Sequence, residues 1–147
     1  MKAMTRAATF ALALTAVAGL GALQPAYAAR TAEIVNVENE KLPVATTAAK
    51  VEQAVLQSLS NRGWTILNRA PGKVDAQYAR RDFSATITVT WTASAFSVMY
   101  KDSTGLSYDE GKHKIHTNYN RWVENLRTDV IRMVTNDANG VPPPQPQ

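Results

Sequence analysis

The stretch "DFSATITVTWT", residues 82–92, alternates between apolar and polar side chains. Serine or threonine fills every second position from Ser84 to Thr92. Because successive side chains of a strand point to opposite faces, this alternation is typical of a β-strand with one buried and one solvated face. The stretch therefore predicts a sheet that is covered on one side. The apolar positions are Phe83, Ala85, Ile87, Val89 and Trp91.

The segments on either side continue the strand pattern. "WTILNRA" (64–70) runs to a Pro71-Gly72 turn, "KVDAQYAR" (73–80) follows it, and "AFSVMYK" (95–101) comes after the central stretch. Short turns join strands that run antiparallel. These four segments therefore predict a four-stranded antiparallel meander.

Two segments with a helical period flank the meander. Residues 46–63 form an amphipathic pattern, with Thr46 or Thr47 as N-cap and Gly63 as the stop. Residues 112–134 contain the second pattern, whose apolar arc predicts buried side chains. The members of that arc are Ile115, Tyr119, Trp122, Val123, Leu126, Val130, Met133 and Val134.

These patterns predict one α+β domain over residues 30–135. A short strand at residues 32–39 leads into the first helix, the meander follows, and the second helix ends the domain. Because the sheet has one apolar face, we expect both helices to cover that face. Residues 136–147 are rich in proline and glutamine and predict a disordered tail.

The N-terminus has the pattern of a secretory signal peptide. A short basic segment, "MKAMTR", precedes an uncharged apolar run at residues 7–23, and the sequence Ala-Tyr-Ala ends at Ala28. We expect residues 1–28 to be cleaved after Sec-type export, which predicts a periplasmic protein without stable membrane insertion. The chain has no cysteine, which excludes disulfides and an acylated N-terminal cysteine.

The charge of the exported chain argues against nucleic acid as a partner. Cleavage removes Lys2 and Arg6 from the 16 basic residues, which leaves 14 basic against 12 acidic side chains, a net charge of +2. Nucleic-acid binding normally needs a clustered basic face.

His116 and Asn120 are the first candidates for a binding site. They are four residues apart on the second helical pattern, at the margin of its apolar arc, so their side chains can meet. One interpretation is a ligand or proton-transfer role for His116, and the alternative is a boundary histidine that holds the preceding loop. Asp102 flanks that loop, where aspartate mostly bonds the local backbone.

Glu52 falls inside the apolar arc of the first helix. A buried carboxylate there needs a partner such as Arg69 or Tyr78 and would be a candidate for a perturbed group. The chain contains no nucleophile motif, no phosphate-binding glycine loop and no complete set of zinc ligands. The sequence therefore predicts no catalytic residues, no metal site and no cofactor.

Five stretches resemble a family of small proteobacterial envelope proteins, many of them lipoproteins, for which no activity is established. They are "SLSNRGWTI", "APGKVDAQY", "FSATITVTW", "FSVMYKDSTGLSY" and "IHTNYNRWVENLRTDV". The resemblance implies export and the α+β fold, although Ala-Tyr-Ala stands where the lipoproteins have an acylated cysteine. It also implies a ligand-binding junction between loop and helix, formed by the family's recurring residues Asp102, Ser103, Tyr108, His116 and Asn120.

Two functional hypotheses remain open at this point. The first is a non-catalytic binding or accessory module of the cell envelope, which contacts a protein, a peptide or a glycan through that junction or through the polar face of the sheet. The second is a small periplasmic hydrolase that uses His116 with Asp102 or Glu52. Only the second requires these groups to converge in a cleft.

Overall fold

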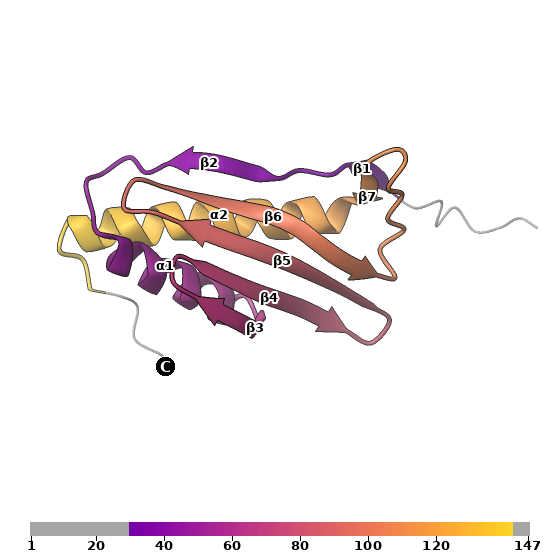
Figure 1. Cartoon of the computed structure of the whole chain (residues 1–147), viewed down its shortest axis with the longest axis horizontal. Coiled ribbons are helices and arrows are strands. Elements are labelled where there is room, and N and C mark those ends of the chain that lie inside the picture. Colours follow the sequence, from indigo (N-terminus) through magenta and orange to yellow (C-terminus); the bar gives the residue numbers. More distant parts are fainter. Residues whose placement is uncertain (1–29, 143–147) are drawn as a thin grey trace, which may run out of the picture.

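The computed structural model describes residues 30–142 of the 147-residue chain. The predicted signal peptide at residues 1–28 and the last five residues of the predicted tail lie outside the described residues. The described part consists of two helices and seven strands, so the predicted α+β class is confirmed (Figure 1). In chain order the elements are β1 (Thr31–Glu33), β2 (Val37–Lys41), α1 (Ala48–Asn61), β3 (Thr65–Ala70), β4 (Lys73–Arg80), β5 (Phe83–Trp91), β6 (Ala95–Thr104), β7 (Lys114–His116) and α2 (Thr117–Ala138).

The main sheet has five strands, where the sequence predicts four. The meander β3-β4-β5-β6 is present with every neighbouring pair antiparallel, and β2 adds to its far side in the order β2-β6-β5-β4-β3. Strand β2 pairs Val37 with Val98 and Lys41 with Ala95 of β6. The prediction of four strands was wrong because this pairing joins residues that are 54 to 61 positions apart in the chain (95 − 41 and 98 − 37), which local periodicity does not reveal.

The single strand predicted at residues 32–39 is two strands in two sheets. Strand β1 pairs with β7 in a separate two-stranded sheet, in which Thr31 lies opposite His116. Ile115 therefore belongs to β7 and not to the second helix, although it is fully buried as expected. The polypeptide leaves this small sheet and crosses to the main sheet within three residues.

Helix α1 lies within the predicted range 46–63, whereas α2 is shifted toward the C-terminus of the predicted range 112–134 and begins at Thr117. Thr47 caps α1, because its hydroxyl oxygen accepts a hydrogen bond from the Lys50 backbone N–H at 3.3 Å. Helix α2 continues to Ala138, so the first residues of the predicted tail at 136–147 are helical. Gly140 then adopts a left-handed conformation (φ +70°), which lets the Val141 N–H bond the Asn136 carbonyl and close the helix.

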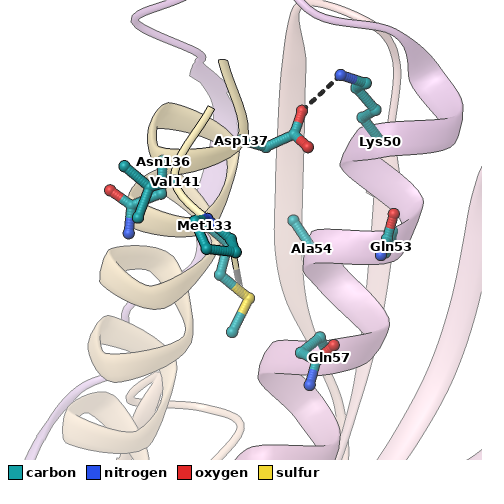
Figure 2. A pocket seen from close by; sticks show the side chains of 9 residues that line it. Lys50, Gln53, Ala54, Gln57, Met133, Asn136, Asp137 and Val141 are labelled. Atoms are coloured by element: carbon teal, nitrogen blue, oxygen red, sulfur yellow. Dashed lines mark ion pairs between the residues drawn. The ribbon is translucent and has the colours of Figure 1, made fainter. Parts of the chain in front are cut away.

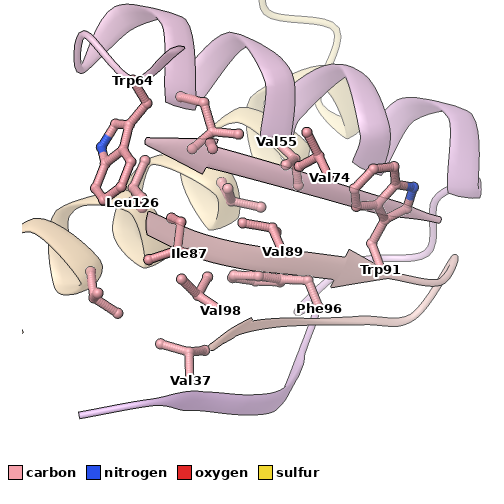
Figure 3. Close-up of a cluster of buried hydrophobic side chains, with 14 of the residues drawn as sticks. Val37, Val55, Trp64, Val74, Ile87, Val89, Trp91, Phe96, Val98 and Leu126 are labelled. Carbon is pink, nitrogen blue, oxygen red and sulfur yellow. The ribbon is translucent and has the colours of Figure 1, made fainter. Parts of the chain in front are cut away.

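One hydrophobic core lies between the helices and the apolar face of the sheet. Figure 1 shows α1 and α2 behind the strands of the main sheet. The alternation in β5 is confirmed, since Ala85, Ile87, Val89 and Trp91 are all buried. Figure 3 shows these strands' side chains meeting those of the helices, such as Val55 of α1 and Leu126 of α2. At about 25 cal/mol for each Å² of buried apolar surface, this core supplies the main stabilisation of the fold.

Candidate functional site

The predicted junction consists of the end of β6, residues 105–113 and the start of α2. The loop is held by backbone hydrogen bonds: the His116 N–H donates to the Leu106 carbonyl at 2.8 Å, and Asp109 exchanges two bonds with Lys114. Ser107 and His113 both adopt left-handed conformations, with φ near +50°. The loop therefore has a defined path, although most of its side chains are exposed.

Ser103 and Tyr108 of the predicted site meet at a third residue, Tyr100. The Ser103 hydroxyl lies 2.8 Å from the Tyr100 hydroxyl, and the Tyr108 ring stacks on the Tyr100 ring with centroids 4.5 Å apart. The rings of Tyr100 and Tyr119 of α2 also form a T-shaped pair, with centroids 5.6 Å apart. Burial raises the pKa of Tyr100 and, more strongly, that of Tyr119, so both phenols are neutral. The arrangement is a tyrosine cluster that fastens the loop to the core.

His116 is the N-cap of α2. Its Nδ1 accepts a hydrogen bond from the Asn118 backbone N–H at 3.2 Å. This bond satisfies one of the donors that the first turn of a helix leaves without an internal partner.

Asn120 uses both ends of its carboxamide to hold the connection between β1 and β2. Its Oδ1 accepts from the Val35 N–H at 3.0 Å, and its Nδ2 donates to the Glu33 carbonyl at 2.7 Å. The sequence predicts that His116 and Asn120 together hold the preceding loop. In the structure the Asn120 side chain instead binds a segment more than 80 residues earlier in the chain.

Asp102 projects on the face of the sheet opposite to the helices. A bulge in β6 separates the pair Thr86–Asp102 from the pair Ile87–Tyr100. The extra residue is Lys101, so Lys101 and Asp102 both point to the polar face, while Tyr100 and Ser103 point to the apolar face. The bulge therefore separates Asp102 from the other four predicted site residues.

Glu52 lies on α1 and forms an ion pair with Arg69 of β3, with Oε1 and Nη2 2.5 Å apart. Arg69 is one of the two partners that were predicted for Glu52 from the sequence. Both side chains are more than a third exposed, so the pair is a surface contact. Within residues 30–142, no hydrogen bond or ion pair connects His116 with Asp102 or with Glu52.

The uncovered face of the main sheet, one of the two surfaces that the sequence suggested for binding, carries a polar cluster whose residues were not among the predicted site residues. The Asp75 carboxylate accepts from the Thr88 hydroxyl at 2.6 Å and pairs with the Lys101 ammonium at 2.6 Å, and its side chain is only 8% exposed. Lys101, and then Thr88, hold the pKa of Asp75 below its usual value. On the same face Gln77 donates to the Thr86 hydroxyl. The alternation of Lys73, Asp75 and Gln77 in "KVDAQYAR" was the available signal for this face.

Four aromatic rings gather at the end of the sheet where β4 turns into β5. Trp122 of α2 stacks on Phe83 at 5.4 Å and meets Tyr78 at 4.9 Å, and Tyr78 meets Trp64 at 5.6 Å. Arg80 covers the Tyr78 ring at 5.1 Å. Trp122 is partly buried, so it is core-associated as predicted but keeps contact with solvent.

A groove lies between the start of α1 and the end of α2 (Figure 2). Ala54 and Met133 form its floor, and the ion pair Lys50–Asp137, at 2.7 Å, closes one end. Its volume of about 70 Å³ is well below the range of about 300–1,000 Å³ that is typical of small-molecule sites. The groove is therefore too small to enclose a metabolite.

Comparison with known proteins leaves the family unassigned. No protein-family model matches the sequence, and no curated protein and no solved structure matches it. Among residues 30–142, no three histidine, aspartate or glutamate side chains gather as a metal site would require. Within the same residues, none of the helices is long and apolar enough to cross a membrane.

Proposed function

We propose that this chain is a non-catalytic binding module of the bacterial cell envelope and that it binds through the polar face of its five-stranded sheet. One observation carries the proposal: side chains on this face are bonded to one another across three strands, on a surface that no element of residues 30–142 covers. Figure 1 supports this arrangement, since both helices lie behind the sheet.

The polar face is ordered before any partner arrives. Asp75 of β4 holds Thr88 of β5 and Lys101 of β6, and Gln77 holds Thr86. Side chains that are already bonded in place lose little conformational freedom when a ligand binds, which favours affinity.

The chemistry of this face favours a polar, extended partner. Hydroxyls follow one another along β5, and ammonium and amide groups flank them on the neighbouring strands. Hydroxyl and amide groups complement the hydroxyl and acetamido groups of glycans and the backbone of peptides. An envelope glycan or an extended peptide therefore fits the face better than an apolar ligand.

The positions of the candidate catalytic groups support a non-catalytic role. His116 uses its Nδ1 to cap α2, and Glu52 is bound to Arg69 on α1. Asp102 lies on the opposite side of the sheet from His116's helix. A hydrolytic site needs a nucleophile or water, a base and an oxyanion donor within hydrogen-bonding reach of one another.

The envelope assignment rests on the export pattern of the N-terminus. We expect the mature chain to begin at Ala29 and to be recovered in the periplasmic fraction. Mass spectrometry of the exported chain checks the processing site. An intact Met1, or firm retention in membranes, would contradict the export part of the proposal.

Binding can be tested by making the same threonine-to-arginine change at two positions, one on the polar face and one on α2. Thr90 lies on the polar face between Lys73 and Ser97, and Thr128 lies on the exposed side of α2. Thr90→Arg should reduce co-sedimentation with purified envelope glycan, or cross-linking to envelope peptides in cells, at least tenfold. Thr128→Arg should change neither. Equal binding by both variants would contradict the assignment of the polar face.

A further inference from the structure

Strand β3 forms one edge of the main sheet, and only one of its sides is paired. It bonds to β4 alone, and all six of its residues are exposed. Within residues 30–142 no backbone hydrogen bond reaches its outer side. An edge strand of this kind is a template for pairing with another chain.

The side chains of β3 make this edge apolar. Ile66 is 36% exposed and Leu67 is 47% exposed, and they are two of the five large hydrophobic residues that the described surface exposes. Ile66 lies opposite Ala76 on the apolar side of the sheet, and Leu67 is the unpaired residue of a bulge between Ile66 and Asn68. The edge therefore combines unpaired backbone with two exposed aliphatic side chains.

Helix α1 continues this apolar surface beside the strand. Its outer side is a shallow hollow lined by small, aliphatic and amide side chains. Glu52 is the one charged residue in the lining, and Arg69 of β3 already neutralises it. The surface of α1 next to β3 thus carries no uncompensated charge. The lining residues are Ala49, Glu52, Gln53, Leu56 and Gln57.

The opposite edge of the sheet has the features that prevent pairing. Strand β2 carries Glu38, Glu40 and Lys41 within five residues, and Asn39 there adopts a left-handed conformation (φ +49°). Arg127 of α2 binds Glu40 and fastens this edge to the helix. Charges and irregular backbone are common protections of edge strands. Strand β2 carries three charged side chains, whereas β3 carries one, Arg69, and one bulge, at residue 67.

We propose that two copies of this chain pair through β3, antiparallel to each other about a two-fold axis, so that the two sheets become one. A two-fold interface presses one patch against the same patch, which excludes surfaces with unbalanced charge. The surface of β3 and α1 meets this condition, because its Glu52 and Arg69 are paired within each copy.

Helix α1 supplies the area that the strand lacks. Stable interfaces bury roughly 800 Å² on each partner, more than a six-residue strand offers by itself. Because α1 lies beside β3, the two-fold axis also brings α1 against its symmetry mate. Leu56 and Ala49 then pack across the axis, on the side of the sheet where Ile66 of β3 lies. A second copy pairs the free edge of β3 and buries the exposed surface of α1 at the same time, whereas a single peptide strand would pair only the edge.

The oligomeric state of the full chain tests this proposal. At a concentration of about 100 μM the wild-type chain should sediment with twice the mass of one chain, and Leu67→Glu should halve that mass. Val35→Glu is the matched control, because Val35 is 44% exposed and lies far from β3, in the connection between β1 and β2. It should leave the dimer intact. A monomeric wild-type chain would overturn the proposal and leave β3 open to a strand of another protein.

Single cysteines provide an independent test, because the chain contains none. Residues that face each other across an antiparallel pair have Cα atoms about 4.5–5.5 Å apart, within the range that a disulfide spans. Leu67→Cys or Asn68→Cys, at the centre of β3, should therefore form a disulfide-linked dimer on mild oxidation. Val35→Cys should not. Cross-linking of all three variants to the same extent would show random collision and would count against the β3 interface.

Discussion

The carboxylate of Asp129 on α2 holds the guanidinium of Arg62, the residue that ends α1, by two hydrogen bonds. Nε lies 2.7 Å from Oδ2 and Nη2 lies 3.2 Å from Oδ1. The Asp129 side chain is 5% exposed, whereas that of Arg62 is 43% exposed. A second arginine, Arg132, reaches the same carboxylate at 2.8 Å. The contact fixes the end of one helix against the middle of the other.

Replacing Asp129 with asparagine should lower the free energy of unfolding by about 1–2 kcal/mol. The variant leaves a buried amide that cannot satisfy both arginines, but these keep access to water, so the cost stays below that of a fully buried broken pair. Urea denaturation measures the change. Glu124→Gln on the same helix is the control, because Glu124 pairs with Arg127 at the surface and should cost less than about 1 kcal/mol. Equal losses for the two variants would contradict the assigned role of Asp129.

The stability of the polar face should depend on pH through Asp75. Its pKa is lower in the folded chain than in the unfolded chain, because Lys101 and Thr88 bind the ionised carboxylate. This carboxylate therefore stabilises the fold above the unfolded pKa of about 3.9, and the contribution is lost as the pH falls through the lower folded value. Asp75→Asn should be less stable than wild type at pH 7, and the difference should shrink below about pH 4. A difference that is independent of pH would argue against an ionised Asp75.

Removal of the His116 ring should weaken the start of α2. His116→Ala deletes the acceptor for the Asn118 N–H and should cost about 0.5–2 kcal/mol. His116→Asp supplies a carboxylate acceptor at the positive end of the helix and should restore the loss. Thermal denaturation at pH 7 compares the variants. If His116→Asp were as unstable as His116→Ala, capping would not be the role of this residue.

Asn120 should govern the connection between β1 and β2. Asn120→Ala removes the acceptor of the Val35 N–H and the donor to the Glu33 carbonyl. The amide of Val35 should then exchange with solvent about five- to tenfold faster, the equivalent of about 1 kcal/mol for one hydrogen bond. Amides of the loop at residues 105–112 should be unchanged. Faster exchange at residues 105–112, with unchanged exchange at Val35, would instead support the prediction that Asn120 holds this loop.

Two glycines with similar φ angles, Gly105 and Gly140, should differ in their tolerance of a side chain. Gly105 (φ +67°) approaches the Asp82 carbonyl so closely that a Cβ would lie 2.1 Å from its oxygen, whereas a Cβ on Gly140 (φ +70°) would meet nothing within 4 Å. Gly140→Ala should lower the free energy of unfolding by about 1–2 kcal/mol, because only the left-handed conformation is unfavourable for alanine there. Gly105→Ala should cost more, because the β4–β5 turn must also move. Equal shifts in the melting temperature would contradict the close approach.

Local patterns in the sequence predicted the regular elements and their inner faces. The alternation along β5 predicted which of its side chains are buried, and Pro71-Gly72 predicted the turn between β3 and β4. Thr46 and Thr47 were the two predicted N-caps of α1, and Thr47 is the one that caps it. These features depend on the period of side chains along one element and on backbone preferences of single residues, so neighbours in the sequence suffice to determine them.

Only the tertiary structure decided which segments pair and which candidate residues meet. The pairing of β2 with β6, and of β1 with β7, depends on contacts between distant parts of the chain. One bulge in β6 turned Lys101 toward Asp75 and separated Asp102 from the rest of the predicted site, because a shift of one residue moves a side chain to the other face. The sequence by itself determined the α+β class and the amphipathic faces. The composition of the candidate sites was decided by strand register, which is set by the packing of the whole core and not by any local pattern.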